Sequence, residues 1–520
     1  MTSPEAPPLG RSAKEPKHWL VLAAACVGAF AVAYNTTAVM TALPAIKSSL
    51  DLGAGTLQWV INIYMLTTAA SLAGLGHFAD VFGMLRVFAI GLISFALGSL
   101  AIAFADDAGV VLAGRVFQGI GVAGLIATSV ALINVTTPEE KRTGAIGLWA
   151  GSVAIGFALG PLIGGFLTDA ISWRAIFVLD LAILGSAGLL CFLAARAGLV
   201  PSAMEKDTRI DYPGMAFLAV ALGCFLYGLT SGEIIGWTAL QTLVLLTVAV
   251  LGACAFVVRE LRTESPLVNF GFFAHSDYIA ATTGMIINGF GQIGVLYFFN
   301  LFLQAPEGLN FSAADAGFAL LPFTFAMFTV AMLAPRLLPP DRLGHGLIVA
   351  MLMLAIGFSL LYDTTSQTHY GMIWWKLVII GIGIGLCWSL LPRVGLRALP
   401  DASSGQGSGV ISTCNFIGLA IGTAAGSVVA SQLKRSEIAS VLADLAPRAS
   451  DLDALEATLL HGSQSQIASA LAKLPADDAK TIEGALRAAF DHAFSGVMIM
   501  MVGVCVFGAV LCFMLIGKKA

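Results

Sequence analysis

Long apolar segments, separated by short polar ones, run through almost the whole chain. A helix needs about 20 mostly apolar residues to cross a bilayer, and the sequence contains about fourteen segments of that kind. An even number of crossings places both ends of the chain on the same side of the membrane. The pattern therefore predicts an all-α membrane protein with about 14 transmembrane helices.

The composition agrees with a chain that lies mostly in lipid. Of the 520 residues 58% are hydrophobic and 11% are charged, and the mean hydropathy is +0.88; in soluble domains about a quarter of the residues are charged. All eight cysteines fall inside apolar segments, which argues against a disulfide framework or a zinc site. We expect no metal, no cofactor and no nucleic-acid partner.

The positions of the basic residues predict how the chain is oriented in the membrane. Most of the 27 Lys and Arg lie at the two ends of the chain and in loops on the same side as the ends. The short loops of the opposite side carry only Lys47 and Arg174. Because basic residues in short loops stay in the cytoplasm, we expect a multi-pass protein of the cell (inner) membrane with both termini cytoplasmic.

Polar interruptions divide the chain into five parts. We expect a cytoplasmic tail over 1–17, a first bundle of six helices over 18–196, and a linker with two extra transmembrane helices over 197–274. A second six-helix bundle follows over 275–516, with a short cytoplasmic tail over 517–520. Weak duplication of six-span halves is typical of secondary transporters.

Small residues recur at regular spacing in the fifth apolar segment. Gly156, Gly160 and Gly164 lie four residues apart, which places them on nearly one face of a helix, where another backbone could approach closely. Pro161 removes one backbone hydrogen bond and favours a bend. We expect Gly156, Gly160, Pro161, Gly164 and Gly165 to control helix packing during a conformational change.

The polar loop between the second and third segments reads GHFADVFGMLR, Gly76 to Arg86. Gly83 permits a tight turn, and Arg86 could face Asp80 or the carboxyl end of a helix. Spacing alone also fits an ordinary polar loop with one cytoplasmic arginine. The hypothesis that uses more of the pattern is a latch, formed by Gly76, Asp80, Gly83 and Arg86.

Two charges are expected inside the membrane. An arginine within a span costs about 2.5–3.5 kcal/mol, so Arg115 should face the interior of the bundle and find a partner. Asp180 lies at a similar depth in the sixth segment and is the obvious partner. Two interpretations remain open, a static ion pair and a proton-coupling pair.

Several polar and aromatic residues sit within apolar segments and could line a substrate cavity. Hydrogen bonding between neighbouring helices explains such residues equally well. The candidates for the cavity are Asn35, Thr37, Gln118, Trp149, Asn288, Gln292 and Trp388.

The segment 433–490 is the only sizeable polar part of the chain. It alternates short amphipathic patterns with breaks at Pro447 and Pro475, so we expect helical hairpins that cap the outer mouth of the bundle. Neither this segment nor the rest shows the spacing of a nucleophile with a base or of metal ligands. We therefore predict no catalytic residues and no enzyme.

These motifs resemble the fourteen-spanner drug:proton antiporter branch of the major facilitator superfamily, the multidrug efflux type. The similarity covers nearly the whole chain and implies the major facilitator fold, two six-helix bundles plus an extra helix pair. The matching residues are Gly76, Asp80, Gly83 and Arg86; Arg115, Gln118 and Gly119; Gly156 to Gly165; Trp173, Arg174, Ile176 and Phe177; and Gln304, Gly308, Ser312, Gly317 and Pro322.

Two departures from the family pattern bear on the chemistry. Where members of the family carry an aspartate in the first span, this chain has Asn35, and where they usually carry an asparagine early in the sixth span, it has Asp180. Asp180 is the acid that the sequence places clearly inside a span. We expect Asp180, with Arg115, to have taken over proton coupling, and Asn35 to bind substrate as a neutral residue.

The function that the sequence favours is proton-coupled efflux of drugs or other small amphipathic compounds by alternating access. Its partners would be a small-molecule substrate, protons, the lipid bilayer and, if the cell has an outer membrane, a periplasmic adaptor. One alternative within transport is an exporter or importer of a specific endogenous metabolite. The alternative from a different class is a non-transporting membrane receptor.

Overall fold

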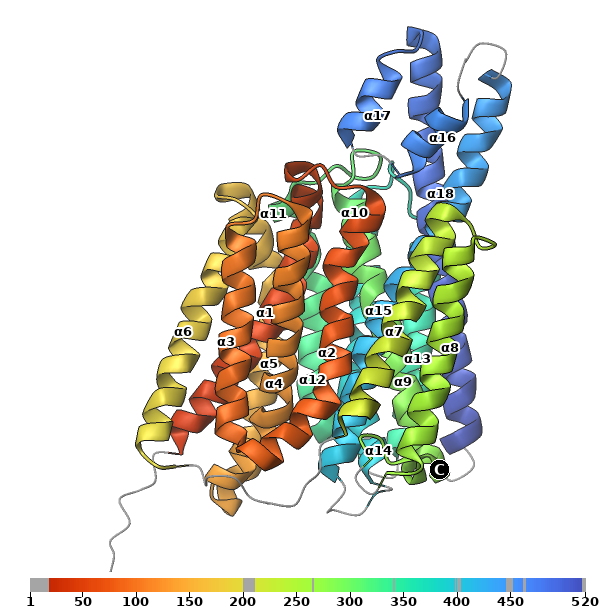
Figure 1. Ribbon diagram of the computed structural model, residues 1–520. Helices are drawn as coiled ribbons and strands as arrows, with labels where there is room; N and C mark the ends of the chain where they lie inside the picture. Colours follow the sequence, from red (N-terminus) through yellow and green to blue (C-terminus); the bar gives the residue numbers. More distant parts are fainter. Residues whose placement is uncertain are drawn as a thin grey trace, which may run out of the picture.

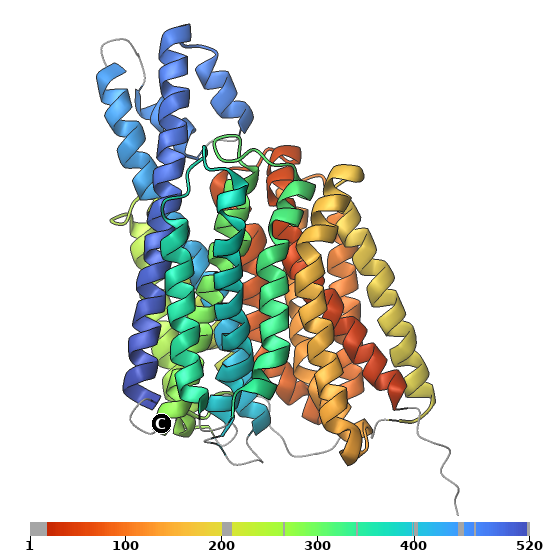
Figure 2. The ribbon, with the colours of Figure 1, turned by 180° about the vertical axis from the view of Figure 1, so that it is seen from behind.

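The computed structural model describes residues 18–199, 211–263, 266–339, 342–397, 399, 404–445, 452–461 and 464–516. The predicted tails over 1–17 and 517–520 lie outside these residues. The described part is helical, and no strand occurs in it. Both ends of the described chain lie at one end of the bundle (Figures 1 and 2). We call this end the terminal side and the opposite end the far side.

The first six helices form one bundle: α1 (Trp19–Ser49), α2 (Ala54–Phe82), α3 (Met84–Ala103), α4 (Ala108–Thr136), α5 (Glu139–Ala170) and α6 (Arg174–Arg196). In this bundle α1 packs against α5 and α6, and α3 packs against α4 and α6. Gly83, with φ of 96°, forms the tight turn between α2 and α3, as expected for a residue without a side chain.

The second bundle is built from η1 (Phe270–Ala274), α9 (Ser276–Ile293), η2 (Gly294–Phe299), α10 (Asn300–Gln304), α11 (Ala313–Ala319), α12 (Leu321–Leu337), α13 (Leu343–Leu361), η4 (Tyr370–Met372), α14 (Trp374–Leu396), α15 (Ser404–Leu445) and α18 (Ala476–Ile516). The segments α9, η2 and α10 form one continuous crossing, in which η2 is a π-helical turn. Likewise α11 and α12 form one crossing.

The two extra helices, α7 (Tyr212–Ile235) and α8 (Leu240–Glu260), pack against each other. Of the two, α7 contacts α2 of the first bundle and α15 of the second, and the rings of Trp59 and Tyr227 meet 5.7 Å apart. On the terminal side Arg259 forms an ion pair with Asp211 at 3.0 Å. Helices α7 and α8 thus cover one seam between the two bundles.

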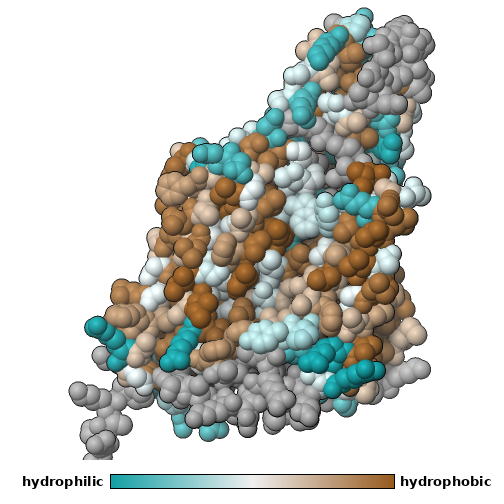
Figure 3. Space-filling model, viewed as in Figure 1, coloured by the Kyte–Doolittle hydropathy of each residue, from teal (hydrophilic) through white to brown (hydrophobic). Residues whose placement is uncertain are grey.

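Among the described residues, 13 helical segments are long and apolar enough to cross a membrane. Helix α2, of 29 residues, runs alongside them, and together they confirm the prediction of about 14 membrane helices. Large apolar side chains such as Ile90, Ile93 and Leu97 are exposed around the bundle. Figure 3 shows a broad apolar belt on one face of the molecule, with polar residues gathered toward both ends. Such an exposed belt is stable when lipid covers it.

A small helical cap stands on the far side (Figure 1). Helices α15 and α18, of 42 and 41 residues, are twice as long as a crossing requires, and their far ends join α16 (Leu452–His461) and α17 (Gln464–Leu471). We use the name helical cap for these four parts. It has its own apolar core, formed by Ile438, Leu442, Leu459, Ile482 and Ala489.

Candidate functional site

A closed ring of polar side chains lies inside the first bundle. Asn35 comes from α1, Ser99 from α3, Arg115 and Gln118 from α4, and Asp180 from α6. Each of these five residues is at most 1% exposed. Since unpaired polar groups are costly in an apolar interior, such a cluster persists only when its members satisfy one another.

Two hydrogen-bonded branches connect Arg115 with Asp180. In the first, Nη1 of Arg115 donates to Oδ1 of Asn35 at 2.9 Å, and Nδ2 of Asn35 donates to Oδ2 of Asp180 at 2.6 Å. In the second, the same Nη1 donates to Oε1 of Gln118 at 2.8 Å. Nε2 of Gln118 then donates to Oγ of Ser99 at 2.8 Å, which donates to Oδ2 of Asp180 at 3.1 Å.

The chemistry of the charged groups fixes the orientation of both amides. A guanidinium can only donate and a carboxylate can only accept. Asn35 must therefore turn its oxygen toward Arg115 and its nitrogen toward Asp180, and Gln118 must do the same toward Arg115 and Ser99. The orientation of the two amides therefore depends on the charged groups of Arg115 and Asp180.

Arg115 and Asp180 were expected to contact each other directly, but a relay of hydrogen bonds through other side chains connects them. Among the described ion pairs, none joins these two residues. Oδ1 of Asp180 is buried and has no hydrogen-bond partner in the described part of the chain. Asn35 and Gln118, expected in a substrate cavity, lie in this relay instead. The sequence revealed the two charges but not the residues that separate them.

Tyr64 of α2 completes the surroundings of Arg115 and was missed from the sequence. The guanidinium carbon lies 3.9 Å from the centre of the Tyr64 ring, a favourable cation–π distance. Nε of Arg115 donates to the carbonyl oxygen of Val60 at 2.9 Å. Ser99 was missed as well, because one serine in an apolar helix carries no recognisable motif.

The other expected cavity residues lie at separate places. The Thr37 hydroxyl donates to carbonyl oxygens of its own helix, and Trp149 packs in a small apolar cluster with Ala25 and Ile133. Trp388 of α14 faces Phe157 of α5 across the two bundles, with ring centres 6.1 Å apart.

Asn288 and Gln292, both on α9, are fully buried. Nε2 of Gln292 donates to the Asn288 backbone oxygen at 3.4 Å, whereas the side-chain oxygen of Asn288 has no partner among the residues that the structure describes. A buried acceptor without a partner is rare in proteins, and the place of Asn288 in a substrate cavity stays a prediction.

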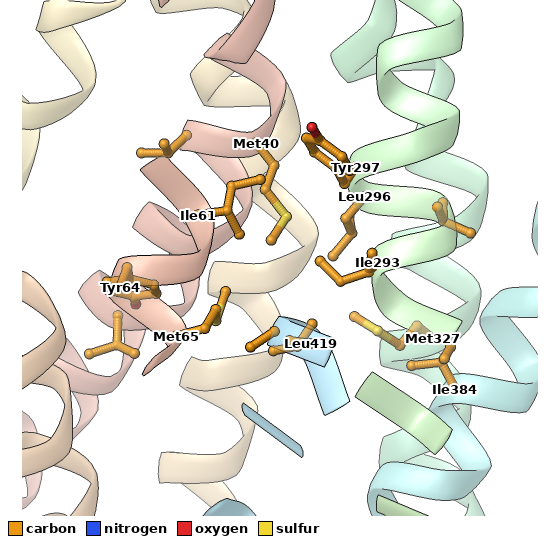
Figure 4. Close-up of a cluster of buried hydrophobic side chains, with 14 of the residues drawn as sticks. Met40, Ile61, Tyr64, Met65, Ile293, Leu296, Tyr297, Met327, Ile384 and Leu419 are labelled. Atoms are coloured by element: carbon orange, nitrogen blue, oxygen red, sulfur yellow. The ribbon is translucent and has the colours of Figure 1, made fainter. Parts of the chain in front are cut away.

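Apolar side chains, several of them methionines, lie where the two bundles face one another. Figure 4 shows Met40, Ile61 and Met65 from α1 and α2 on one side. Ile293, Leu296, Met327, Ile384 and Leu419, from the second bundle, lie opposite them. Methionine side chains are flexible and adapt to irregular shapes, so this surface could accept ligands of different form.

On the far side the two bundles are fastened by hydrogen bonds to backbone groups. Nδ2 of Asn300 donates to the carbonyl oxygen of Met40 at 2.6 Å, and Nε2 of Gln304 donates to that of Thr41 at 2.8 Å. The backbone nitrogen of Ala314 donates to Oδ2 of Asp169 at 2.8 Å. The far side of the bundle is therefore closed.

The glycine face of α5 serves two different contacts. A Cβ on Gly156, Gly160 or Gly164 would meet α1 of the same bundle. The Cβ position of Gly156 lies 2.7 Å from the carbonyl oxygen of Phe30, and the Cβ position of Gly164 lies 2.6 Å from the Cα of Ala38. Gly165 instead faces the backbone of Ala313 in the second bundle. Only Gly165 therefore packs across the halves.

Gly160→Leu should lower the stability of the fold itself. A side chain there would run into Oγ1 of Thr37, and its Cβ would lie 2.8 Å from the Tyr34 carbonyl oxygen. Overpacking of this kind typically costs about 1–3 kcal/mol. We expect a lower melting temperature and lower yield of monodisperse protein in mild detergent. The matched control is Gly147→Leu on the same helix, because nothing lies within 4 Å of its Cβ position; equal losses in both variants would contradict the assignment.

The expected latch at the terminal side is only partly described. Gly83 forms the turn, and Arg86 is exposed on the first turn of α3. The surroundings of Gly76 and Asp80 lie outside the described residues. The latch thus stays a prediction.

Many apolar crossings, two six-helix bundles joined at their far ends, and a buried charge relay define a multi-pass membrane transporter. A comparison with family models agrees: the model described as Major Facilitator Superfamily matches residues 25–423. The chain therefore belongs to the Major Facilitator Superfamily.

Characterised relatives are resistance and export proteins. The chain is 32% identical over 416 residues to the multidrug resistance protein Stp of Mycobacterium tuberculosis, covering 80% of this chain and 76% of the relative. It is 30% identical over 407 residues to the tetracenomycin C resistance and export protein of Streptomyces glaucescens, covering 78% and 74%. The multidrug efflux pump LfrA of Mycolicibacterium smegmatis is 27% identical over 483 residues, covering 92% of both chains.

Solved structures share the fold. A bacterial homologue of the human lysosomal transporter Spinster aligns with a TM-score of 0.62 at 16% identity, covering 97% of this chain and 98% of the other. A peptide transporter named POT aligns with a TM-score of 0.57 at 15% identity, covering 97% of both chains. At these identities the likeness concerns the fold alone.

Proposed function

We propose that this protein exports drugs or other small amphipathic compounds from the cytoplasm in exchange for protons. The terminal side would face the cytoplasm, as the positions of the basic residues favour, and the protein would reside in the cell (inner) membrane. In a cell with an outer membrane, a periplasmic adaptor would be a further partner. The names of the relatives support drugs as the class of substrate.

The observation that carries proton coupling is the relay between Arg115 and Asp180. A coupling group must exist both with and without its proton at modest cost, and Asp180 holds no direct ion pair among the described residues. Its Oδ2 accepts two hydrogen bonds while its Oδ1 has no partner. The free oxygen is the atom that a proton would reach.

Protonation would be felt at Arg115 through the amide of Asn35. A charged Asp180 requires the nitrogen of Asn35 to point toward it, and this orientation presents the oxygen to Arg115. A neutral carboxylic acid accepts the hydrogen bond from Asn35 more weakly than a carboxylate does, so the amide, whose oxygen Arg115 still holds, would be free to move away from Asp180. Arg115, which also contacts α2 at Val60 and Tyr64, would then change its packing against α2.

The surface between the bundles supports a broad range of substrates. A transporter for one metabolite would place fixed charged or hydrogen-bonding groups where the halves meet. Here mainly methionine, leucine and isoleucine meet between the bundles (Figure 4). On α9, Asn288 adds a buried side-chain oxygen without a hydrogen-bond partner among the described residues.

Transport would proceed by alternating access, with the parts 18–196 and 275–516 rocking about the substrate site. The far-side contacts at Asp169, Asn300 and Gln304 would close the outer end while substrate enters from the cytoplasm. They would have to separate before release.

The test is uptake into inverted membrane vesicles from cells that produce the protein. Ethidium, a lipophilic cation, and chloramphenicol, an uncharged antibiotic, represent two classes of drug. We expect uptake of at least one of them when the vesicle interior is acidified, and its loss when nigericin collapses the proton gradient. Uptake that is independent of the gradient, or absent for a wide panel of amphipathic drugs but present for one metabolite, would contradict the proposal.

A further inference from the structure

A cavity of about 430 Å³ lies on the far side, between the closed end of the bundle and the helical cap. Its floor is formed by the far ends of α1 and α2 and by the loop after α10; its walls are α15, α18 and the cap helices α16 and α17. The volume falls within the roughly 300–1,000 Å³ of small-molecule sites. The ring around Asp180 contributes no residue to it.

The apolar part of the wall combines phenylalanine rings with aliphatic side chains. Phe298, Phe490 and Phe494 line the cavity together with Leu459 and Ile467 of the cap. The π-helical turn η2 positions Phe298, and π-helical turns are frequent at functional sites. Phe494 stacks on Phe302 with ring centres 4.3 Å apart, so the wall is firmly supported.

The charged residues of the wall have an excess of positive charge. Lys47 of α1 and Lys434 of α15 line the cavity, and Glu307 is the only acidic residue among the lining side chains that the structure describes. Lys47 and Glu307 attract one another, and the Lys434 ammonium lies 4.9 Å from the centre of the Phe490 ring. The two lysines come from different bundles.

We propose that this cavity is a second ligand site, distinct from the substrate site between the two bundles, and that it binds amphipathic anions. The apolar chain or ring of the ligand would lie against the phenylalanines and the cap. Its carboxylate, phosphate or sulfonate would lie between Lys47 and Lys434. A free amphipathic acid and an anionic membrane lipid share this chemistry.

The site does not depend on the direction of transport or on its coupling to protons. The assay therefore measures binding alone, in the full chain reconstituted into nanodiscs of phosphatidylcholine. The probe is dansyl-undecanoic acid, whose fluorescence rises in apolar surroundings. Its methyl ester, which lacks the charge, and the cation dansyl-cadaverine are the comparison probes, and empty discs give the background.

We expect saturable binding of the acid and weaker binding of the ester and the cation. Replacing both lysines, Lys47→Met with Lys434→Met, should weaken binding of the acid about tenfold and leave the ester unchanged. The matched control is Lys480→Met, a lysine exposed on the cap helix α18 outside the cavity. Ser431→Trp should abolish binding of both probes, because Ser431 lines the cavity and the indole would fill it.

Equal affinity of the acid for the parent protein and the double-lysine variant would overturn the charge assignment. Unchanged binding in Ser431→Trp would overturn the location, whatever the lysine variants show. Tighter binding of dansyl-cadaverine than of the acid would overturn the class of ligand. Competition by phosphatidylglycerol in the discs would identify a membrane lipid as the occupant, and its absence would identify a free amphipathic acid.

Discussion

Asp180→Asn is expected to abolish uphill transport driven by a proton gradient while downhill exchange of substrate continues. The asparagine side chain has nearly the same size, and Asp180 forms no direct ion pair within the described part of the chain, so the helices can pack as before. Asparagine, however, cannot alternate between a charged and a neutral form as aspartate does. The measurement is drug uptake into inverted vesicles over a range of pH, compared with counterflow in the absence of a gradient.

The control for Asp180→Asn is Asp106→Asn. Asp106 also forms a contact with an arginine, Arg174 at 3.4 Å, but its side chain is 96% exposed on the far side. We expect this variant to transport normally. If Asp180→Asn is produced in normal amounts and still transports uphill with an unaltered pH profile, Asp180 is not the coupling group. If it is produced poorly while any folded fraction remains active, its role is structural.

The exchange Asn35→Asp with Asp180→Asn tests the relay more directly. The two side chains are hydrogen-bonded to each other at 2.6 Å, so the exchange keeps one acid and one amide in the same pair. The acid would then stand beside Arg115, where Asn35 accepts a hydrogen bond. We expect part of the coupling to return, with a changed pH profile.

The sequence predicted the number of crossings because each crossing has its own signal, a run of apolar residues of membrane length. It also predicted that Arg115 and Asp180 lie inside the bundle, where both are buried, since a charged residue in such a run is conspicuous. It did not predict what separates Arg115 from Asp180. The relay residues Ser99, Gln118 and Asn35 come from three helices, and only their packing brings the side chains together.

The glycines of α5 show the same limit. A four-residue spacing indicates that Gly156, Gly160 and Gly164 share a face, but periodicity contains no information on which helix covers that face. The structure assigns those three to α1 and the next residue, Gly165, to Ala313 of the other bundle. The difference of one position decides whether a substitution disturbs the fold or the closure.

Gly165→Leu is accordingly expected to keep the far side from closing. A Cβ on Gly165 would meet the carbonyl oxygen of Ala313 and lie 3.0 Å from the Cα of Ala314, so the backbones of α5 and α11 could no longer approach. The overpacking would destabilise only the state in which the far side is closed, by about 1–3 kcal/mol. Since about 1.4 kcal/mol changes a ratio of populations tenfold, most molecules would open toward the far side.

The position of the equilibrium can be measured at Thr41, which is 1% exposed and whose carbonyl oxygen accepts the hydrogen bond from Gln304. We call the far-side contacts of Asp169, Asn300 and Gln304 the gate. A cysteine introduced at this position, Thr41→Cys, should react slowly with a membrane-impermeant maleimide applied from the far side. In Gly165→Leu the reaction should become several times faster, and the parent protein without the introduced cysteine gives the background.

Two further variants separate a shifted equilibrium from general damage. Gly151→Leu lies on the same helix with nothing within 4 Å of its Cβ position, and should leave the labelling rate unchanged. Asp169→Ala removes the acceptor for the Ala314 nitrogen without adding bulk, and should accelerate labelling by a smaller factor than Gly165→Leu. Because the closed far side is the state that loads substrate in the proposed cycle, Gly165→Leu should also slow transport. Slow labelling together with full transport in Gly165→Leu would show that the contact between α5 and α11 is not part of the gate.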